Sequence, residues 1–252
     1  MSIWLFLWFI FAIIIIFVTG WSTYILIQQK QAWKKFAEKH KIKFRPGKFF
    51  APCEMDGMID GFMVSFFTGV QQNPEARKNR QLTILEITDS VPFVDGVAAG
   101  SSEMKAFIEL INTLTWHNME GKKWDKQHLI ASRHKESVEA FLTDSRIKIL
   151  NEMLSFPSSD VIVIFDDVQG VFRFETTNPL TDADKIDEML QKLFARIKKL
   201  RPSEEEIKKF KSLRKAEEAA PPPVQEEKPV EEAAPEETKP EEKEESKEES
   251  KD

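Results

Sequence analysis

Cysteine is almost absent from this chain of 252 residues, which contains Cys53 alone. A single cysteine excludes an intramolecular disulfide, and the sequence has no Asn-x-Ser/Thr acceptor for N-glycosylation. Disulfides and glycans are typical of domains that face an oxidising compartment. Their absence is consistent with a reducing compartment.

The sequence also lacks the short motifs that cradle phosphates, activate a serine or bind zinc on a helix. It contains no G-x-x-x-x-G-K-[ST], G-x-S-x-G or H-E-x-x-H pattern, and no G-x-G-x-x-G between a strand and a helix. No two of its four histidines are spaced i, i+4. The sequence therefore predicts no catalytic residue, no metal site and no cofactor.

An active site would have to be assembled from dispersed residues by the tertiary fold. A metal site would need His117, His128 and His134 to meet Cys53 or Glu120, and a reactive thiol would need a lowered pKa and a positioned base. We expect instead a packed core cysteine and ordinary histidines, His40 included. A deep pocket that contains two or more of the following residues would favour an enzyme: His117, His128, Asp166, Glu54 and Cys53.

Charge divides the chain unevenly. The net charge is −6, but residues 217–252 hold fifteen acidic residues and five lysines, so the rest of the chain is net positive. The segment repeats "PEE" and "EEKEESKEES" and has too few apolar residues to form a core. We expect a disordered acidic tail over 217–252 that acts as a solubilising or interaction segment.

The N-terminal segment "IWLFLWFIFAIIIIFVTGWSTYILI" has no charge over residues 3–27. A bilayer core of about 30 Å needs roughly 20 apolar helical residues. Trp4 and Trp8 near one end, and Trp21 and Tyr24 toward the other, suit the two interfaces of a membrane. We predict an uncleaved transmembrane anchor. The rival is a cleaved signal peptide, disfavoured because the run is long and lacks an A-x-A-like site.

Basic residues follow the apolar run and none precedes it. Because Lys and Arg stay on the cytoplasmic side, we expect a single-pass protein of the inner plasma membrane with its N-terminus outside. The same lysines either set the topology alone or also contact anionic lipid headgroups. The candidate membrane-interface residues are Lys30, Lys34, Lys35, Lys39, Lys41 and Lys43.

Residues 28–200 predict one compact α+β domain of antiparallel strands and helices. The first helix continues beyond the span, with Trp33, Phe36 and Ala37 on one face, until "RPG" at 45–47. Asp60-Gly61 predicts a hairpin turn, and residues 71–80 predict a polar loop. The remaining expected elements are a strand at 82–88, a helix at 102–115, a strand at 124–132, one or two helices in 135–154, a hairpin turning at Gln169-Gly170, and a helix at 182–200.

Two charged groups have structural and functional interpretations. Acidic residues near turns and helix starts (Glu54, Asp56, Asp60, Asp166, Asp167, Asp182, Asp184, Asp187 and Glu188) suit turn chemistry and the helix dipole better than acid–base catalysis. The basic segment 201–216 opens with the capping-box pattern Ser203-x-x-Glu206. We expect a solvated basic helix or linker there; the alternative is a membrane contact through Ile207, Phe210 and Leu213.

The order of the elements resembles a known group. The span, "FAEKHKIKFRPGK", the hairpin "MDGMIDGFMVSFF", the block "WDKQHLIAS…SVEAFLTDSRIKILNEML" and the last hairpin and helix are together similar to uncharacterised membrane-tethered bacterial α+β proteins. The similarity covers roughly residues 30–200 and rests on element order. It implies a bacterial origin and carries over no catalytic or ligand residues.

The sequence favours a membrane-tethered cytoplasmic module that binds protein partners, with the lipid bilayer as its other partner. The alternatives are a membrane-bound enzyme with a dispersed site and a sensor of anionic lipid surfaces. Nucleic acid is not expected, because aromatic residues are sparse among the basic ones and the acidic tail adjoins them. No small-molecule substrate is indicated.

Overall fold

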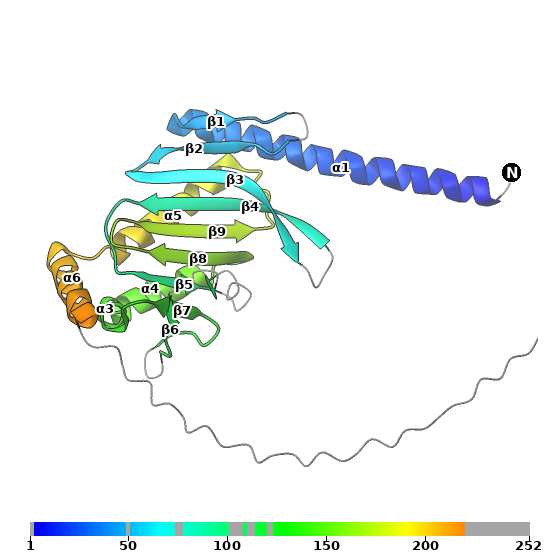
Figure 1. Ribbon diagram of the computed structural model, residues 1–252. Coiled ribbons are helices and arrows are strands. Elements are labelled where there is room, and N and C mark those ends of the chain that lie inside the picture. The colour runs from blue at the N-terminus through cyan, green and yellow to red at the C-terminus, as the bar shows by residue number, and fades with distance from the viewer. Residues whose placement is uncertain are drawn as a thin grey trace, which may run out of the picture. The chain divides into compact units, whose positions relative to one another are not determined.

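The computed structural model describes residues 3–48, 51–73, 78–100, 108–109, 114–119 and 123–219. An antiparallel sheet of nine strands in the order β1-β2-β3-β4-β9-β8-β5-β7-β6 forms the centre of the α+β domain (Figure 1). The strands are β1 (Lys43–Arg45), β2 (Glu54–Ile59), β3 (Phe62–Asn73), β4 (Lys78–Asp89), β5 (Gly96–Ala99), β6 (Thr115–Trp116), β7 (Leu129–Ser132), β8 (Ser159–Phe165) and β9 (Gly170–Thr176). The helices are α1 (Ile3–His40), α3 (Lys135–Phe141), α4 (Asp144–Leu154), α5 (Ala183–Leu200) and α6 (Glu204–Ala219).

The α1 helix has two halves with opposite surroundings. From Ile3 to Ser22 every side chain is exposed, whereas Gln29, Ala32, Trp33, Phe36 and Ala37 are buried. These buried positions follow the i, i+3, i+4, i+7, i+8 spacing of one helix face. The first half is therefore an unpartnered apolar rod, and the last third is part of the domain core.

The end of α1 differs from the sequence expectation. The helix stops at His40, before "RPG", because Lys41 takes a left-handed conformation with φ 55°. The amides of Lys41 and Ile42 donate back to the carbonyls of Glu38 (3.4 Å) and Ala37 (3.0 Å), which is the Schellman pattern of a helix end. The chain can thus turn at once into the edge strand β1.

The predicted hairpin at Asp60-Gly61 is confirmed. Both residues have positive φ (52° and 85°), and Ile59 pairs with Phe62 across the turn. Two positive φ values characterise the type I′ turn, whose twist matches that of the strands it joins. The next hairpin is longer than predicted, since β3 and β4 extend into the expected polar loop and pair as far as Asn73 and Lys78.

Two predicted elements differ from the structure. The expected helix at 102–115 lies mostly outside the described residues; Ile108 and Glu109 are helical, but Thr115 belongs to β6. The expected strand at 124–132 is shorter, because residues 126–127 form a turn and β7 begins at Leu129.

The second half of the domain follows the sequence pattern closely. Residues 135–154, predicted to form one or two helices, form two, α3 and α4, and Thr143 caps α4 by accepting from the amide of Arg146. Strands β8 and β9 form the predicted hairpin, although Gly170 is the first residue of β9 rather than part of the turn. The apolar stripe of α5, made of Ile186, Leu190, Leu193, Ile197 and Leu200, is buried throughout, and Asp182 caps the helix through the amides of Asp184 and Lys185.

The two faces of the sheet carry different layers. One face packs against α1, α3, α4, α5 and α6 in the main core, where Phe62 stacks on Phe194 at 4.6 Å. On the other face, Val97, Ala99, Ala131 and Ile162 pack with Ile108 in a small second cluster beneath β5, β7 and β8. The opposite face of β1 to β4 and β9 has no described helix over it.

The α6 helix packs on its own domain. Its predicted capping box is present, since Ser203 N–H donates to Glu206 Oε2 (2.8 Å) and Glu206 N–H donates to Ser203 Oγ (3.2 Å). Phe210 is buried edge-to-face against Phe141 of α3. The interpretation of this apolar side as a membrane contact is therefore wrong. Residues 217–219, expected in the tail, also belong to α6, and 220–252 lie outside the described residues.

Leu190→Ala tests the packing of α5. Leu190 is almost fully buried, so we expect the free energy of unfolding to fall by about 2–5 kcal/mol. The measurement is urea unfolding of the detergent-solubilised full chain. Lys199→Ala, on the exposed side of the same helix, is the control and should change stability by less than about 0.5 kcal/mol. Equal stabilities of the two variants would contradict the assigned core face.

Candidate functional site

The predicted membrane-interface lysines have different surroundings along α1. Lys30 Nζ donates to the carbonyl of Lys48 at 2.8 Å, and Lys34 lies 3.8 Å from Glu38. Lys35 and Lys39 reach across to α5, where they pair with Asp184 (3.4 Å) and Asp187 (2.6 Å). Exposed Lys41 and Lys43 follow the end of the helix. The residues grouped by the sequence are therefore divided: Lys35 and Lys39 join α1 to α5, whereas Lys30 and Lys34 make contacts near the last turns of α1 and Lys41 and Lys43 follow its end.

The acidic start of α5 has a role beyond complementing its own helix dipole. Asp187 accepts from Lys39 and also lies 2.9 Å from His40 Nε2. The hydrogen bond from Lys39, and secondarily that from His40, lowers the pKa of the Asp187 carboxyl. These contacts join α1 to the start of α5.

The other histidines serve local structure. His128 joins α4 through Asn151 (2.9 Å) and Ser155 (3.3 Å), and its carbonyl accepts from Trp124 Nε1 at 3.0 Å. His117 Nε2 lies 2.6 Å from Ser132 Oγ, and burial lowers the pKa of this imidazole. Within the described residues, no three His, Cys, Asp or Glu side chains are grouped as metal ligands would be. Glu120 lies outside those residues.

Cys53 lies in the main core, as predicted, with no exposed surface. Burial raises the pKa of its thiol to about 11. A thiol with this pKa is protonated at neutral pH, whereas a nucleophilic or redox cysteine needs the thiolate. The position therefore has the properties of a small apolar core residue.

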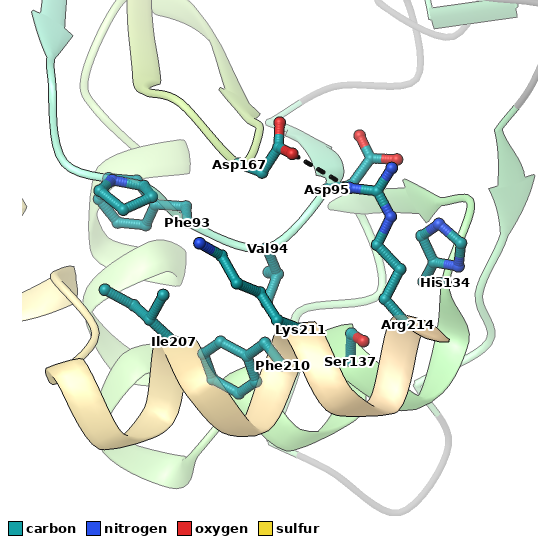
Figure 2. Close-up of a pocket in the computed structure, with 11 residues that line it drawn as sticks. Phe93, Val94, Asp95, His134, Ser137, Asp167, Ile207, Phe210, Lys211 and Arg214 are labelled. Carbon is teal, nitrogen blue, oxygen red and sulfur yellow. Dashed lines mark hydrogen bonds and ion pairs between the residues drawn. The ribbon is translucent and has the colours of Figure 1, made fainter. Parts of the chain in front are cut away.

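A small hollow lies between α6, α3 and the segment before β5 (Figure 2). Phe93, Ile207 and Phe210 give it an apolar wall, while His134, Ser137 and Arg214 stand on the other side. Its volume of about 30 Å³ suits roughly two water molecules, far below the several hundred Å³ of a substrate pocket.

The side chains around this hollow do not form a nucleophilic triad. Ser137 Oγ is buried and has no hydrogen-bond partner among the residues that the structure describes. His134 directs Nδ1 toward Glu217 (3.1 Å) and has Glu218 3.8 Å from Nε2. A general base must lie within hydrogen-bond reach of the group it deprotonates. The geometry instead joins α3 to α6, since Glu217 also accepts from the Glu136 amide at the start of α3.

A broader hollow of about 360 Å³ lies on the sheet face that has no described helix over it. We call this surface the open face; it comprises Arg45, Glu54, Asp56, Met58, Met63, Ser65, Phe67, Glu86, Arg173 and Glu175. Arg45 pairs with Glu54 (3.2 Å) and Asp56 (2.7 Å), while Arg173 pairs with Glu175 (2.7 Å). Carboxylates outnumber guanidiniums, and Met58 and Met63 add exposed apolar area. The surface is shallow, mixed and acidic.

A network of two arginines was not predicted from the sequence. Arg201, expected only to end α5, holds the fully buried Asp89 of β4 through Nε (2.7 Å) and Nη2 (3.0 Å). Arg146 of α4 makes two bonds to Glu206 of α6 (2.8 and 2.7 Å) and another to the Arg201 carbonyl (3.3 Å). The capping box marked Glu206 in the sequence, but no local signal identified its partner.

No known protein family, curated protein or solved structure matches this chain. The similarity to membrane-tethered bacterial α+β proteins therefore stays a prediction. Of the residues set out as a test for an enzyme, the 30 Å³ hollow contains none and the open face contains Glu54 alone. The features found in the described residues are therefore exposed surfaces and polar contacts that join one secondary-structure element to another.

Glu206→Gln tests the joint between α4 and α6. The bonds from Arg146 lower the pKa of Glu206 to about 2, from 4.5. The carboxylate therefore stabilises the fold fully above about pH 4.5, and this contribution is lost as the pH falls toward 2. We expect the variant to lose about 1–3 kcal/mol at pH 7, because Arg146 keeps its buried charge without an anionic partner.

The measurement is urea unfolding of the full chain in detergent between pH 7 and pH 3. The difference between wild type and Glu206→Gln should shrink as the pH falls. Glu205→Gln, on an exposed neighbour, should leave the pH profile unchanged. A pH-independent difference for Glu206→Gln would show that the carboxylate is not held in its charged form by Arg146.

Proposed function

We propose that this protein is a membrane-anchored interaction module that presents its α+β domain to protein partners at the cytoplasmic face of the inner membrane. The observation that carries the proposal is the division of α1. Its first half is apolar, uncharged and not buried against any described residue, and the helix then continues into the core.

This division favours a membrane anchor over two alternatives, the buried core helix of a soluble protein and a cleaved signal sequence. The apolar core helix of a soluble protein is mostly buried, whereas the first half of α1 contacts nothing that covers it. A signal sequence is separated from the folded domain by cleavage, whereas α1 passes without interruption into its buried residues Gln29 and Trp33. A bilayer supplies the apolar surroundings that this segment requires.

The open face supports binding as the role of the domain. Helices cover the other side of the sheet, so a partner that reads the strands β2 and β3 must approach this face. Its surplus of carboxylates and its exposed Met58 and Met63 suit a protein segment with basic and apolar side chains. Among the described residues, the hollow near Ser137 is too small for a substrate, and the larger hollow on the open face is shallow and contains only Glu54 of the residues expected in an enzyme site.

The orientation follows from the basic residues after the span, and cysteine labelling tests it. In a Cys53→Ser background we expect Glu205→Cys to react with a membrane-impermeant maleimide only after the cells are permeabilised, because the domain is cytoplasmic. Ser2→Cys should react in intact cells. Carbonate extraction should leave both variants in the membrane pellet. Labelling of Glu205→Cys in intact cells would reverse the proposed orientation, and extraction of the protein would refute the anchor.

Site-specific photo-crosslinking in cells tests the open face. A photoreactive amino acid at Met63 should yield discrete adducts with a partner, because this side chain is exposed between charged pairs. The same group at Val168, an exposed position in the turn between β8 and β9, should not yield them. Adding Asp56→Lys and Glu86→Lys should abolish the Met63 adducts. Identical adducts from Met63 and Val168, unaffected by these changes, would refute the assigned face.

A further inference from the structure

Strand pairing on the open face places two carboxylates on either side of one serine. Ser65 of β3 lies opposite Asp56 of β2 and opposite Glu86 of β4, the two strands that flank β3 in the sheet (Figure 1). Residues directly opposite one another in an antiparallel sheet project from the same face. Because neighbouring strands lie about 4.8 Å apart, the backbones that carry the two carboxylates are about 10 Å apart, with a short side chain between them.

Two larger side chains stand before and after this serine along β3. Met63 and Phe67 are two residues away from Ser65 in either direction, so the alternation of side chains along a strand puts all three on the open face. The hollow of about 360 Å³ is lined by these residues and by both carboxylates. We call this part of the hollow, formed by Asp56, Met63, Ser65, Phe67 and Glu86, the Ser65 cup.

Charges alternate along the row of residues that crosses the cup, except at its centre. Lys43 of β1 lies opposite Asp56, and Arg173 of β9 lies opposite Glu86. From β1 to β9 the row is therefore basic, acidic, neutral, acidic and basic. Among the described residues of this row, both cations lie outside the carboxylates and only Ser65 lies between them. A cation at the centre would complete the alternation.

Both carboxylates can accept further hydrogen bonds. Asp56 pairs with Arg45 through Oδ1 at 2.7 Å. Glu86 Oε2 lies 3.7 Å from Arg173 Nη1, beyond hydrogen-bond length, while Arg173 Nε donates to Glu175 at 2.7 Å. An ionised carboxylate has about four acceptor positions, so these contacts leave several unused. The side chains of Asp56 and Glu86 are only 28% and 33% exposed, which strengthens their attraction for a cation relative to a fully solvated pair.

The aromatic wall favours a guanidinium as that cation. Arg173 Cζ already lies 5.7 Å from the centroid of the Phe67 ring, within the range of a cation–π contact. A guanidinium is planar and has N–H donors on opposite edges, so one group can bridge carboxylates on two sides. The aliphatic stem of an arginine can pack against Met63. A lysine ammonium is a compact point charge without this fork.

We propose that the Ser65 cup binds an arginine side chain of the protein partner, with the guanidinium between Asp56 and Glu86. The inference rests on the proposed function and identifies the kind of residue that the open face recognises. Met58 lies opposite Met63 and is exposed beside the cup. It offers apolar contact to the residues that flank the arginine.

The test is a titration of the full chain in detergent micelles, followed by NMR of isotope-labelled methionine methyl groups. The probe is N-acetylarginine amide, and N-acetylcitrulline amide is the control of similar shape without charge. We expect a saturable shift of the Met63 signal with the arginine probe in the millimolar range, a weaker effect with N-acetyllysine amide and none with citrulline. The Met189 signal should not move, because α5 lies on the other side of the sheet.

Two pairs of substitutions separate the cup from a general effect of charge. Asp56→Asn with Glu86→Gln should weaken arginine binding by about tenfold, because two charge-assisted hydrogen bonds are lost. Glu204→Gln with Glu205→Gln removes the same charge from exposed positions at the start of α6 and should leave binding unchanged. Methionine spectra recorded without the probe verify that each variant retains its fold.

Three results would overturn the inference. They are the absence of a saturable Met63 shift in the wild type, equal binding of the arginine probe and either the lysine or the citrulline probe, and equal weakening by the two pairs of substitutions.

Photo-crosslinking from Met63 in cells distinguishes this inference from the proposed function. The adducts formed by the wild type should be lost when Asp56→Asn and Glu86→Gln are added. Adducts that persist would retain the open face as an interaction surface and overturn its recognition of arginine. A wild type that forms no Met63 adducts would refute the proposed function, and the inference with it.

Discussion

The continuity of α1 is the constraint on which the rest of the structure depends. One helix of 38 residues contains both the exposed apolar segment and the core residues Trp33 and Phe36, so no flexible linker separates the two. A helix transmits position and direction over its whole length, at about 1.5 Å per residue. The placement of the domain is therefore set within two turns of the apolar segment. The salt bridges from α1 to α5 extend this constraint to the neighbouring helix on the same face of the sheet.

Polar joints complete the assembly at the end of the domain remote from the apolar rod. Asp89, Arg201, Arg146 and Glu206 connect β4, α4, α5 and α6 through charge-assisted hydrogen bonds. Burying one of these charged groups is costly unless its oppositely charged partner stays in contact with it. The network therefore fixes α6 in one position, with Phe210 in the core.

The sequence predicted those helices and turns that are determined by residues adjacent in the chain. Asp60-Gly61 supplied the left-handed conformations of a type I′ turn, Asp182 supplied a cap, and the Ile186–Leu200 stripe supplied a helix period. The end of α1 was missed because "RPG" is a strong breaker, whereas the helix already ends in a Schellman turn at Lys41. The β3–β4 hairpin was predicted too short because its polar residues resemble a loop, while pairing across the strands decides their conformation.

The partners of charged residues could not be read from the sequence. Lys35 and Lys39 are almost 150 positions from Asp184 and Asp187, and Arg146 is 60 from Glu206. The sequence analysis grouped the six lysines because they lie close together in the chain, after the apolar segment. Tertiary structure divides them by their distance from the apolar segment and by the carboxylates they meet. Sequence alone is likewise compatible with a membrane contact by Phe210, because the residue lies on a basic helix. Only the tertiary structure shows that Phe210 packs on Phe141.

Hydrogen exchange across residues 20–40 of the full chain in lipid nanodiscs tests the central claim most directly. The account predicts slow exchange without interruption from the apolar segment through Gln29 to Ala37, because the backbone hydrogen bonds of one helix cover the whole stretch. Fast exchange confined to residues 27–31, between two protected segments, would show a flexible joint and contradict the rigid attachment of the domain.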